Sequence, residues 1–201
     1  MRKRKPSCRF RFSLALCLGA VVLWLISPRS RSEISVMRGS NVKVGSIREN
    51  ITGLPDERIF EVLLERKVAL ARRTLKPLSI VLFKIDRFTS FALYLQEQAM
   101  RVSSRLVVAT LRDSDTVCHI GPGVIGAILD ETSESGAVWA ADRIRRAALD
   151  APARDVVSLS AGVACYPSHS MDATELLTLG TAALESALVL GPSRIEVTTI
   201  F

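Results

Sequence analysis

Aromatic and metal-ligating side chains are scarce in this chain of 201 residues. Phe, Trp and Tyr together make up 5%, and the chain has two histidines and four cysteines. The two cysteine–histidine pairs, at 118–119 and at 165 and 169, fall on different predicted strands or loops, whereas a structural zinc site needs four convergent ligands. We therefore expect no metal site, no cofactor and no disulfide framework. The chain also lacks a P-loop, a Gly-x-Gly-x-x-Gly turn and a nucleophile–base constellation.

Basic residues are present in excess, but the excess is confined to one end of the chain. Of the 27 Lys and Arg residues, 11 lie within residues 1–50, beside only two acids, Glu33 and Glu49. Residues 51–201 therefore hold 16 basic and 18 acidic residues, a net charge of −2. A DNA-binding domain would carry its basic residues across the fold, so this distribution argues against nucleic acid as a partner. It favours a membrane as the partner of the basic N-terminus.

An uncharged apolar run follows the basic N-terminus. We divide the chain into a basic tail (1–12), a transmembrane anchor (13–27), a juxtamembrane linker (28–48) and a folded domain (49–201). A cleaved signal peptide is the alternative, but no Ala-x-Ala site follows the run. The run of 13–26 is short for a bilayer, and counting Phe10 and Phe12 with a snorkelling Arg11 lengthens it.

The domain shows alternating helical and strand periodicities. Helices are predicted with Pro55 in the first turn and an apolar stripe through Leu75, over 88–111 in two pieces, over 135–149 with Trp139 in the core, and over 173–188. Strands are predicted at 78–85, 116–120, 124–129, 156–164 and 194–200, with a hairpin turn at 121–123. This order predicts an α+β fold, a mostly antiparallel central sheet flanked by helices.

Several stretches, in order over 49–198, resemble landmarks of the GGDEF family, the diguanylate cyclases that condense two GTP molecules into cyclic di-GMP. They are Glu49–Pro55 (ENITGLP, similar to the opening D-x-LTGLPNRR), Phe83–Phe88 (FKIDRF, similar to xDIDRFK), Ser160–Ala164 (SAGVA, similar to SIGVA), Ala173–Leu184 (similar to the LLxxADxALY helix) and Gly191–Arg194 (GPSR, similar to GRNR). The signature hairpin would then fall at 121–125, which reads GPGVI.

The resemblance implies a pocket whose chemistry is missing here. In the family, carboxylates at the end of the first strand and in the signature turn hold the metal, and the matching positions are Lys84, Gly123 and Val124. Lys, Gly and Val cannot hold Mg²⁺. The positions matching the guanine- and phosphate-contacting residues are Ala92, Arg101, Leu188 and Pro192. Asp86 matches a family aspartate that is not the principal metal ligand, and we expect it to cap the helix near Phe88.

One ligand-binding pattern is retained. Arg112 and Asp115 bound a stretch that five residues separate from Gly121, the spacing of the family's RxxD site for cyclic di-GMP, and Arg143 matches a second arginine of that site. Guanidinium groups suit phosphate and the guanine Hoogsteen edge, and a carboxylate accepts from guanine N–H groups. The alternative is structural, because Arg and Asp are common where a helix ends in a turn, and Asp115 would then only order the loop.

From these patterns we expect a membrane-anchored, catalytically inactive GGDEF protein that acts as a regulatory or interaction module. A cyclic di-GMP receptor is the alternative, and an active cyclase a remote one. Candidate partners are the membrane, cyclic di-GMP, another protein or a second copy of the chain. The resemblance places the domain in the cytoplasm at the inner membrane, although the basic residues on either side of the run, six before and four after, lean weakly towards the opposite orientation.

Overall fold

The computed structural model describes residues 51–151 and 157–199, and the expected tail, anchor and linker lie outside the described residues. In chain order the elements are α2 (Glu57–Thr74), β1 (Leu78–Ile85), the 3-10 turn η1 (Phe88–Ser90), α3 (Leu93–Thr110), β2 (Thr116–Gly121), β3 (Val124–Asp130), α4 (Glu134–Leu149), β4 (Leu159–Tyr166), α5 (Ala173–Leu190) and β5 (Ile195–Val197). The five strands form one sheet in the order β2-β3-β1-β4-β5, antiparallel except for the β4–β5 pair. The predicted α+β class is confirmed.

Helix α2 differs from the sequence prediction at both ends. It begins after Asp56, whose carboxylate accepts a hydrogen bond from the Ile59 N–H at 3.1 Å, so Pro55 precedes the cap rather than occupying the first turn. Leu75 was expected in the apolar stripe, but it adopts a left-handed conformation after the helix and is 89% exposed. The stripe therefore ends at Ala71, because the chain turns towards β1 once the helix is capped.

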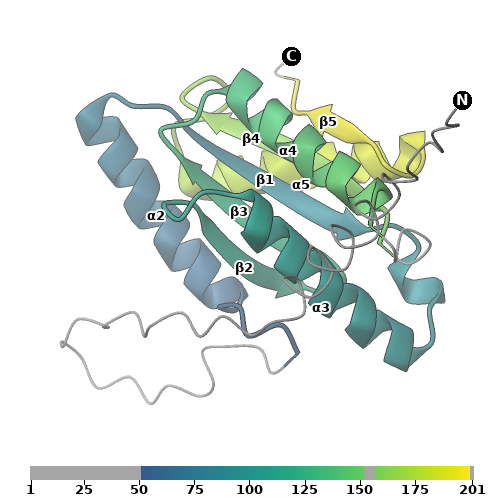
Figure 1. Cartoon of the computed structure of the whole chain (residues 1–201). Helices are drawn as coiled ribbons and strands as arrows, with labels where there is room; N and C mark the ends of the chain where they lie inside the picture. The colour runs from purple at the N-terminus through teal and green to yellow at the C-terminus, as the bar shows by residue number, and fades with distance from the viewer. Residues whose placement is uncertain (1–50, 152–156, 200–201) are drawn as a thin grey trace, which may run out of the picture. The chain divides into compact units, whose positions relative to one another are not determined.

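Alternation along β1 divides the core between the two faces of the sheet. Val81, Phe83 and Ile85 belong to one cluster, with the buried residues of α3 and α4. Ile80 and Leu82 belong to the other, with the buried residues of α2 and α5. Figure 1 shows α3 and α4 in front of the sheet and α5 behind it. Every residue of β1 except Lys84 is buried, as expected for the central strand of a sheet covered on both faces.

Helix α5 lies unusually close to β4. A Cβ added at Gly162 would stand 2.3 Å from the Leu184 amide nitrogen and 2.4 Å from the Gly180 carbonyl oxygen. Both are backbone atoms of a helix interior and cannot move aside locally. Among the described helices, α5 alone is long and apolar enough to cross a membrane, yet its buried residues form part of the core behind the sheet.

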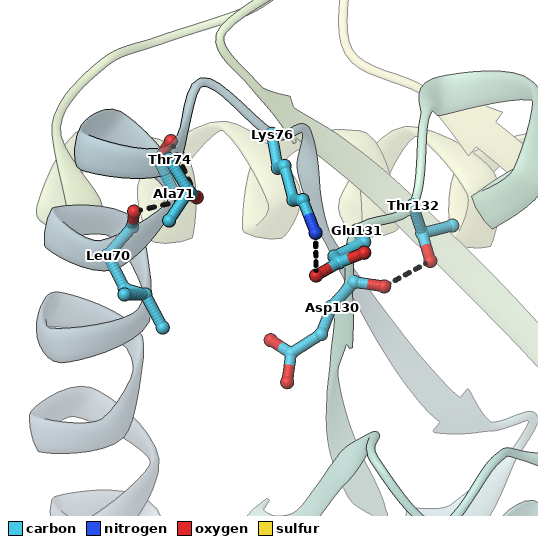
Figure 2. A network of polar contacts seen from close by, with 7 residues as sticks. All are labelled: Leu70, Ala71, Thr74, Lys76, Asp130, Glu131 and Thr132. Atoms are coloured by element: carbon cyan, nitrogen blue, oxygen red, sulfur yellow. Dashed lines mark hydrogen bonds and ion pairs between the residues drawn. The ribbon is translucent and has the colours of Figure 1, made fainter.

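At the end of the sheet where β1 begins, an ion pair joins the segment after α2 to the turn after β3. Lys76 pairs with Glu131 at 2.5 Å, and the Thr132 hydroxyl donates to the Asp130 carbonyl at 2.8 Å (Figure 2). The Thr74 hydroxyl donates back to the Leu70 carbonyl at 2.9 Å, which terminates the last turn of α2 (Figure 2). The positions that match the family's metal ligands lie at the opposite end of the sheet, where β1 finishes beside the β2–β3 turn.

The remaining boundaries move by a few residues. The region 88–111 does form two pieces, η1 and α3. Strand β4 begins at Leu159 rather than 156 and continues to Tyr166, because it pairs with β1 along its whole length. Strand β5 is shorter than the predicted 194–200, since only Ile195–Val197 pair with β4.

Candidate functional site

The turn between β2 and β3 has a backbone that requires glycine at its third position. Pro122 precedes Gly123, whose φ is +75°, the arrangement of a type II turn. A Cβ at Gly123 would also lie 2.6 Å from Cγ of Phe88, a ring that is 6% exposed within the core. The Gly123 carbonyl accepts from the Ile85 N–H at 2.9 Å, which ties the turn to β1. A carboxylate side chain therefore cannot be placed at 123 without moving the turn or the Phe88 ring.

Lys84 lies beside this turn. It is half-buried near the end of β1, paired with Val124 on β3 and Ser160 on β4. The alternation of β1 directs it to the face covered by α2 and α5, whose core has Val124 and Leu188 among its partly buried apolar side chains. Lys84 thus places an ammonium group near the end of this face.

The positions that match the family's base and phosphate contacts are also without suitable groups. Ala92 caps α3 without a side-chain hydrogen bond, Arg101 is exposed on α3, and Pro192 is exposed in the loop before β5. Among the described residues, no group of three or more His, Cys, Asp and Glu side chains is placed to hold a metal ion.

Asp86 has a different role from the one predicted. The N-cap residue of η1 is Arg87, which makes no side-chain cap, so the capping prediction for Asp86 is wrong. Asp86 is 5% exposed and its carboxylate accepts from the Ser158 hydroxyl at 2.5 Å, the Ser160 hydroxyl at 2.6 Å and the Ser193 N–H at 2.9 Å. It therefore joins the end of β1 to the start of β4 and to the loop after α5.

This connection continues to α4. Arg145 donates to the Ser193 hydroxyl at 3.2 Å and to the Asp142 carboxylate at 2.7 Å. The hydrogen bond from Arg145, with the charges of Arg145 and Arg146, lowers the pKa of Asp142. The loop that matches the family's GRNR segment is thus held in place by side chains of three elements. Spacing in the sequence gave no signal for this network, because its members lie up to 107 residues apart.

The three residues of the RxxD-like pattern lie around the C-terminal end of α3. The Arg143 guanidinium donates to the Thr110 carbonyl and stands 4.7 Å from the centroid of the Trp139 ring. Asp115 Oδ2 accepts from the Arg112 N–H at 2.9 Å, which is the loop-ordering contact of the structural alternative. Asp115 Oδ1 is buried and has no hydrogen-bond partner in the described part of the chain.

Trp139 was predicted in the core, and this prediction is wrong. It is 62% exposed, because the buried stripe of α4 is made of small residues at 137, 140, 141 and 148 with Ile144, and Trp139 falls on the opposite side. The exposed ring instead stacks with Arg143, four residues on. Counting the helix positions from Ala137 would have placed it there.

The cysteines and histidines within the described ranges do not converge on a shared metal position. Cys118 and Cys165 are buried free thiols, and burial raises their pKa to about 12 and about 11. His169 Nδ1 accepts from the Cys165 N–H at 2.9 Å, and its Nε2 faces Glu134 at 3.3 Å, so this imidazole orders the turn after β4. Such thiols are protonated near neutral pH and are poor nucleophiles and metal ligands.

Comparison with known proteins adds the decisive observation. The family described as "Diguanylate cyclase, GGDEF domain" matches residues 46–192, almost three quarters of the chain. This chain belongs to the GGDEF family. The expectation drawn from the sequence landmarks is therefore confirmed.

Individual GGDEF proteins are similar to this chain in sequence and in fold. The chain is 29% identical over 156 residues to the diguanylate cyclase DosC of Escherichia coli K12, covering 73% of this chain but only 34% of DosC, so it spans about a third of that relative. The GGDEF domain of YfiN from Pseudomonas aeruginosa is 24% identical, with a TM-score of 0.68 over 74% of this chain and 98% of that one. The GGDEF domain of DgcB from Caulobacter crescentus, solved with c-di-GMP, is 16% identical, with a TM-score of 0.68 over 78% and 98%. These structures establish the fold.

Proposed function

We propose that this protein is a membrane-anchored GGDEF protein without cyclase activity, which acts as a regulatory or interaction module in cyclic di-GMP signalling. Its GGDEF fold is intact, with a continuous core on both faces of the sheet. The proposal concerns the end of β1 and the β2–β3 turn, where the family resemblance places the metal and the triphosphate.

The observation that carries this proposal is the turn at Gly123. At its positive φ a side chain is strained and its Cβ would press on the Phe88 ring, and Lys84 offers a positive charge where a cation would have to bind. Phosphoryl transfer from GTP needs Mg²⁺ to neutralise the phosphate charge, and hard cations need oxygen ligands. The positions that match the family's metal ligands, Lys84, Gly123 and Val124, thus offer no oxygen ligand from a side chain.

The named relatives are cyclases, so activity is the competing prediction. The test is GTP turnover by the purified protein with Mg²⁺ or Mn²⁺, followed by chromatography for cyclic di-GMP. We expect no product above a protein-free control. Product formation that scales with protein concentration, and disappears when Lys84 is changed to Met, would refute the proposal.

A second candidate function is reception of cyclic di-GMP at Arg112, Asp115 and Arg143. The observation in its favour is the buried Asp115 Oδ1, an acceptor without a partner in the described residues. DgcB, which shares the fold, has been solved with this ligand. Binding of labelled cyclic di-GMP tests it, with Arg143→Ala and Asp115→Asn expected to abolish binding. Arg73→Ala, an exposed arginine on α2, is the matched control.

Membrane anchoring by residues 13–27, with linker 28–48 and the domain of 49–201 in the cytoplasm, belongs to the same proposal. The apolar run between basic flanks supports it. Cyclic di-GMP is a cytosolic ligand, so either function in this pathway requires that orientation. Flotation of the expressed protein with membrane vesicles, resistant to alkaline extraction, is the expected behaviour of an anchored chain.

A further inference from the structure

Helix α2 carries a row of three like charges on its exposed side. Glu57, Glu61 and Glu65 follow one another at intervals of four residues, and all three are exposed. None of them forms an ion pair with another residue of the described chain. Like charges at this spacing destabilise the helix that carries them. Exposed Arg58 and Arg66 on the same helix form no ion pair with the row in the described residues, so positive charge supplied from outside the domain would add stability.

Helix α3 carries the complementary arrangement. Arg101 and Arg105, also four residues apart, are both exposed and without an ion-pair partner in the described part of the molecule. Two exposed apolar side chains lie on the same stripe, Tyr94 at 69% and Val108 at 37% exposure. The exposed Glu97 lies on the stripe too, so the stripe combines two guanidinium groups and one carboxylate with exposed hydrocarbon, and arginine with aromatic residues is typical of protein interfaces.

A groove beside the acidic row offers room for such side chains. Between α2 and α5 lies a cavity of about 200 Å³, walled by Glu61, Leu64, Glu65, Ala173, Thr174 and Leu177. Its apolar wall comes from Leu64, Ala173 and Leu177, and the two glutamates stand at the spacing of Arg101 and Arg105. The charges of the groove and of the two arginines on the α3 stripe are therefore complementary.

The groove and the stripe cannot meet within one domain. Helices α2 and α5 cover one face of the sheet, and α3 and α4 cover the other (Figure 1). We propose that a second copy of this chain places its α3 stripe in the α2–α5 groove, so that copies associate head to tail. Because each copy presents one groove and one stripe on opposite faces, the contact is heterologous and leaves a free groove and a free stripe at the two ends. This contact does not depend on whether the domain is catalytically inactive.

Charge reversal tests the contact in the full-length protein, in a non-ionic detergent. The variant Arg101→Glu/Arg105→Glu has acids on both surfaces, and Glu61→Arg/Glu65→Arg has bases on both. We expect sedimentation to show self-association of the wild type, weakened about tenfold or more in each variant, since two attractive pairs become repulsive. An equimolar mixture of the two variants should associate again, because each then meets opposite charge. Glu185→Arg on α5 and Arg73→Glu on α2 are matched controls expected to behave as the wild type.

Cross-linking tests the head-to-tail geometry. In a Cys8→Ser/Cys17→Ser background the remaining cysteines at 118 and 165 are buried. Glu65→Cys and Arg105→Cys should each give no product with a flexible bis-maleimide, their mixture should give a dimer, and the double variant should give a ladder of multimers. A monomeric wild type, unchanged association in both charge variants, no restoration in their mixture, or a dimer of Glu65→Cys alone would each overturn the proposal.

Discussion

Replacing Asp86 separates two roles that a single aspartate after a strand can have. As a helix cap, Asp86 would stabilise only the local turn, and its loss would cost about 1 kcal/mol. In the structure its carboxylate instead accepts from the Ser158 and Ser160 hydroxyls and from the Ser193 N–H, while it is 5% exposed. Removing this carboxylate leaves three donors, the two serine hydroxyls and the Ser193 N–H, without their acceptor.

The expected magnitude follows from these three bonds. A hydrogen bond to a charged group contributes roughly 1.5–3 kcal/mol, and stranding a buried donor costs about 1–3 kcal/mol. The contributions are not additive, since the two serines can partly reorient, so we expect Asp86→Ala to lower the free energy of unfolding by about 4 kcal/mol. Asp86→Asn keeps one oxygen acceptor but presents an NH₂ group to a donor. We expect this change to lower the free energy of unfolding by about 2 kcal/mol.

The measurement is urea denaturation of residues 44–201, the compact unit that contains the domain, followed by far-ultraviolet circular dichroism. With a slope of about 2 kcal/mol per molar urea, Asp86→Ala should lower the midpoint by roughly 2 M. The exposed Asp150→Ala is the control, expected to change stability by less than about 0.5 kcal/mol. In the Asp86→Ala background, a further Ser160→Ala should cost little. A loss of only 1 kcal/mol, or full additivity of the two changes, would refute the network.

Three further outcomes can be checked. Gly162→Ala should destabilise the domain by about 3 kcal/mol or more in the same assay, because the added methyl group meets the backbone of α5 rather than a movable side chain. The triple variant Lys84→Asp/Gly123→Asp/Val124→Glu should still form no cyclic di-GMP and should be less stable than the wild type. The reason is the strain at φ +75° and the contact with the Phe88 ring, and measurable product would mean that these positions are wrongly matched to the family. Fusions at the C-terminal end to reporters active on only one side of the membrane should give cytoplasmic activity; alkaline phosphatase activity there would exclude a cytosolic receptor.

Much of the fold follows from local sequence patterns, because the buried elements have strong periodicity. The continuous apolar run of 78–85 predicts a central strand, and the Gly-Pro-Gly turn predicts the hairpin that β2 and β3 form. The order of the landmarks along the chain was sufficient to identify the family. Boundaries were less well determined: Leu75 continues the apolar spacing of α2, but the cap at this residue ends the helix.

The sequence could predict which residues occupy the candidate site but not how the folded chain places them. Substitutions at Lys84, Gly123 and Val124 are visible in the sequence, and they indicate lost metal ligands. That Gly123 is held at a positive φ against Phe88 depends on two segments 35 residues apart meeting at the end of the sheet. The RxxD-like pattern likewise named Arg112, Asp115 and Arg143, but the contact of Arg143 with the Thr110 carbonyl arises only from the packing of α4 beside α3.

The sequence by itself determined which segments become helices and strands, because periodicity reports how each element must bury its apolar side. Only the tertiary structure decided what the polar residues do. Asp86 stands before a short helix in the sequence and so predicted a cap, but strand pairing brings Ser158 and Ser160 to it, and the return of the chain after α5 brings the Ser193 amide. A hydrogen bond depends on distances of about 3 Å between groups that folding brings together from remote parts of the chain, and no local pattern encodes such a meeting.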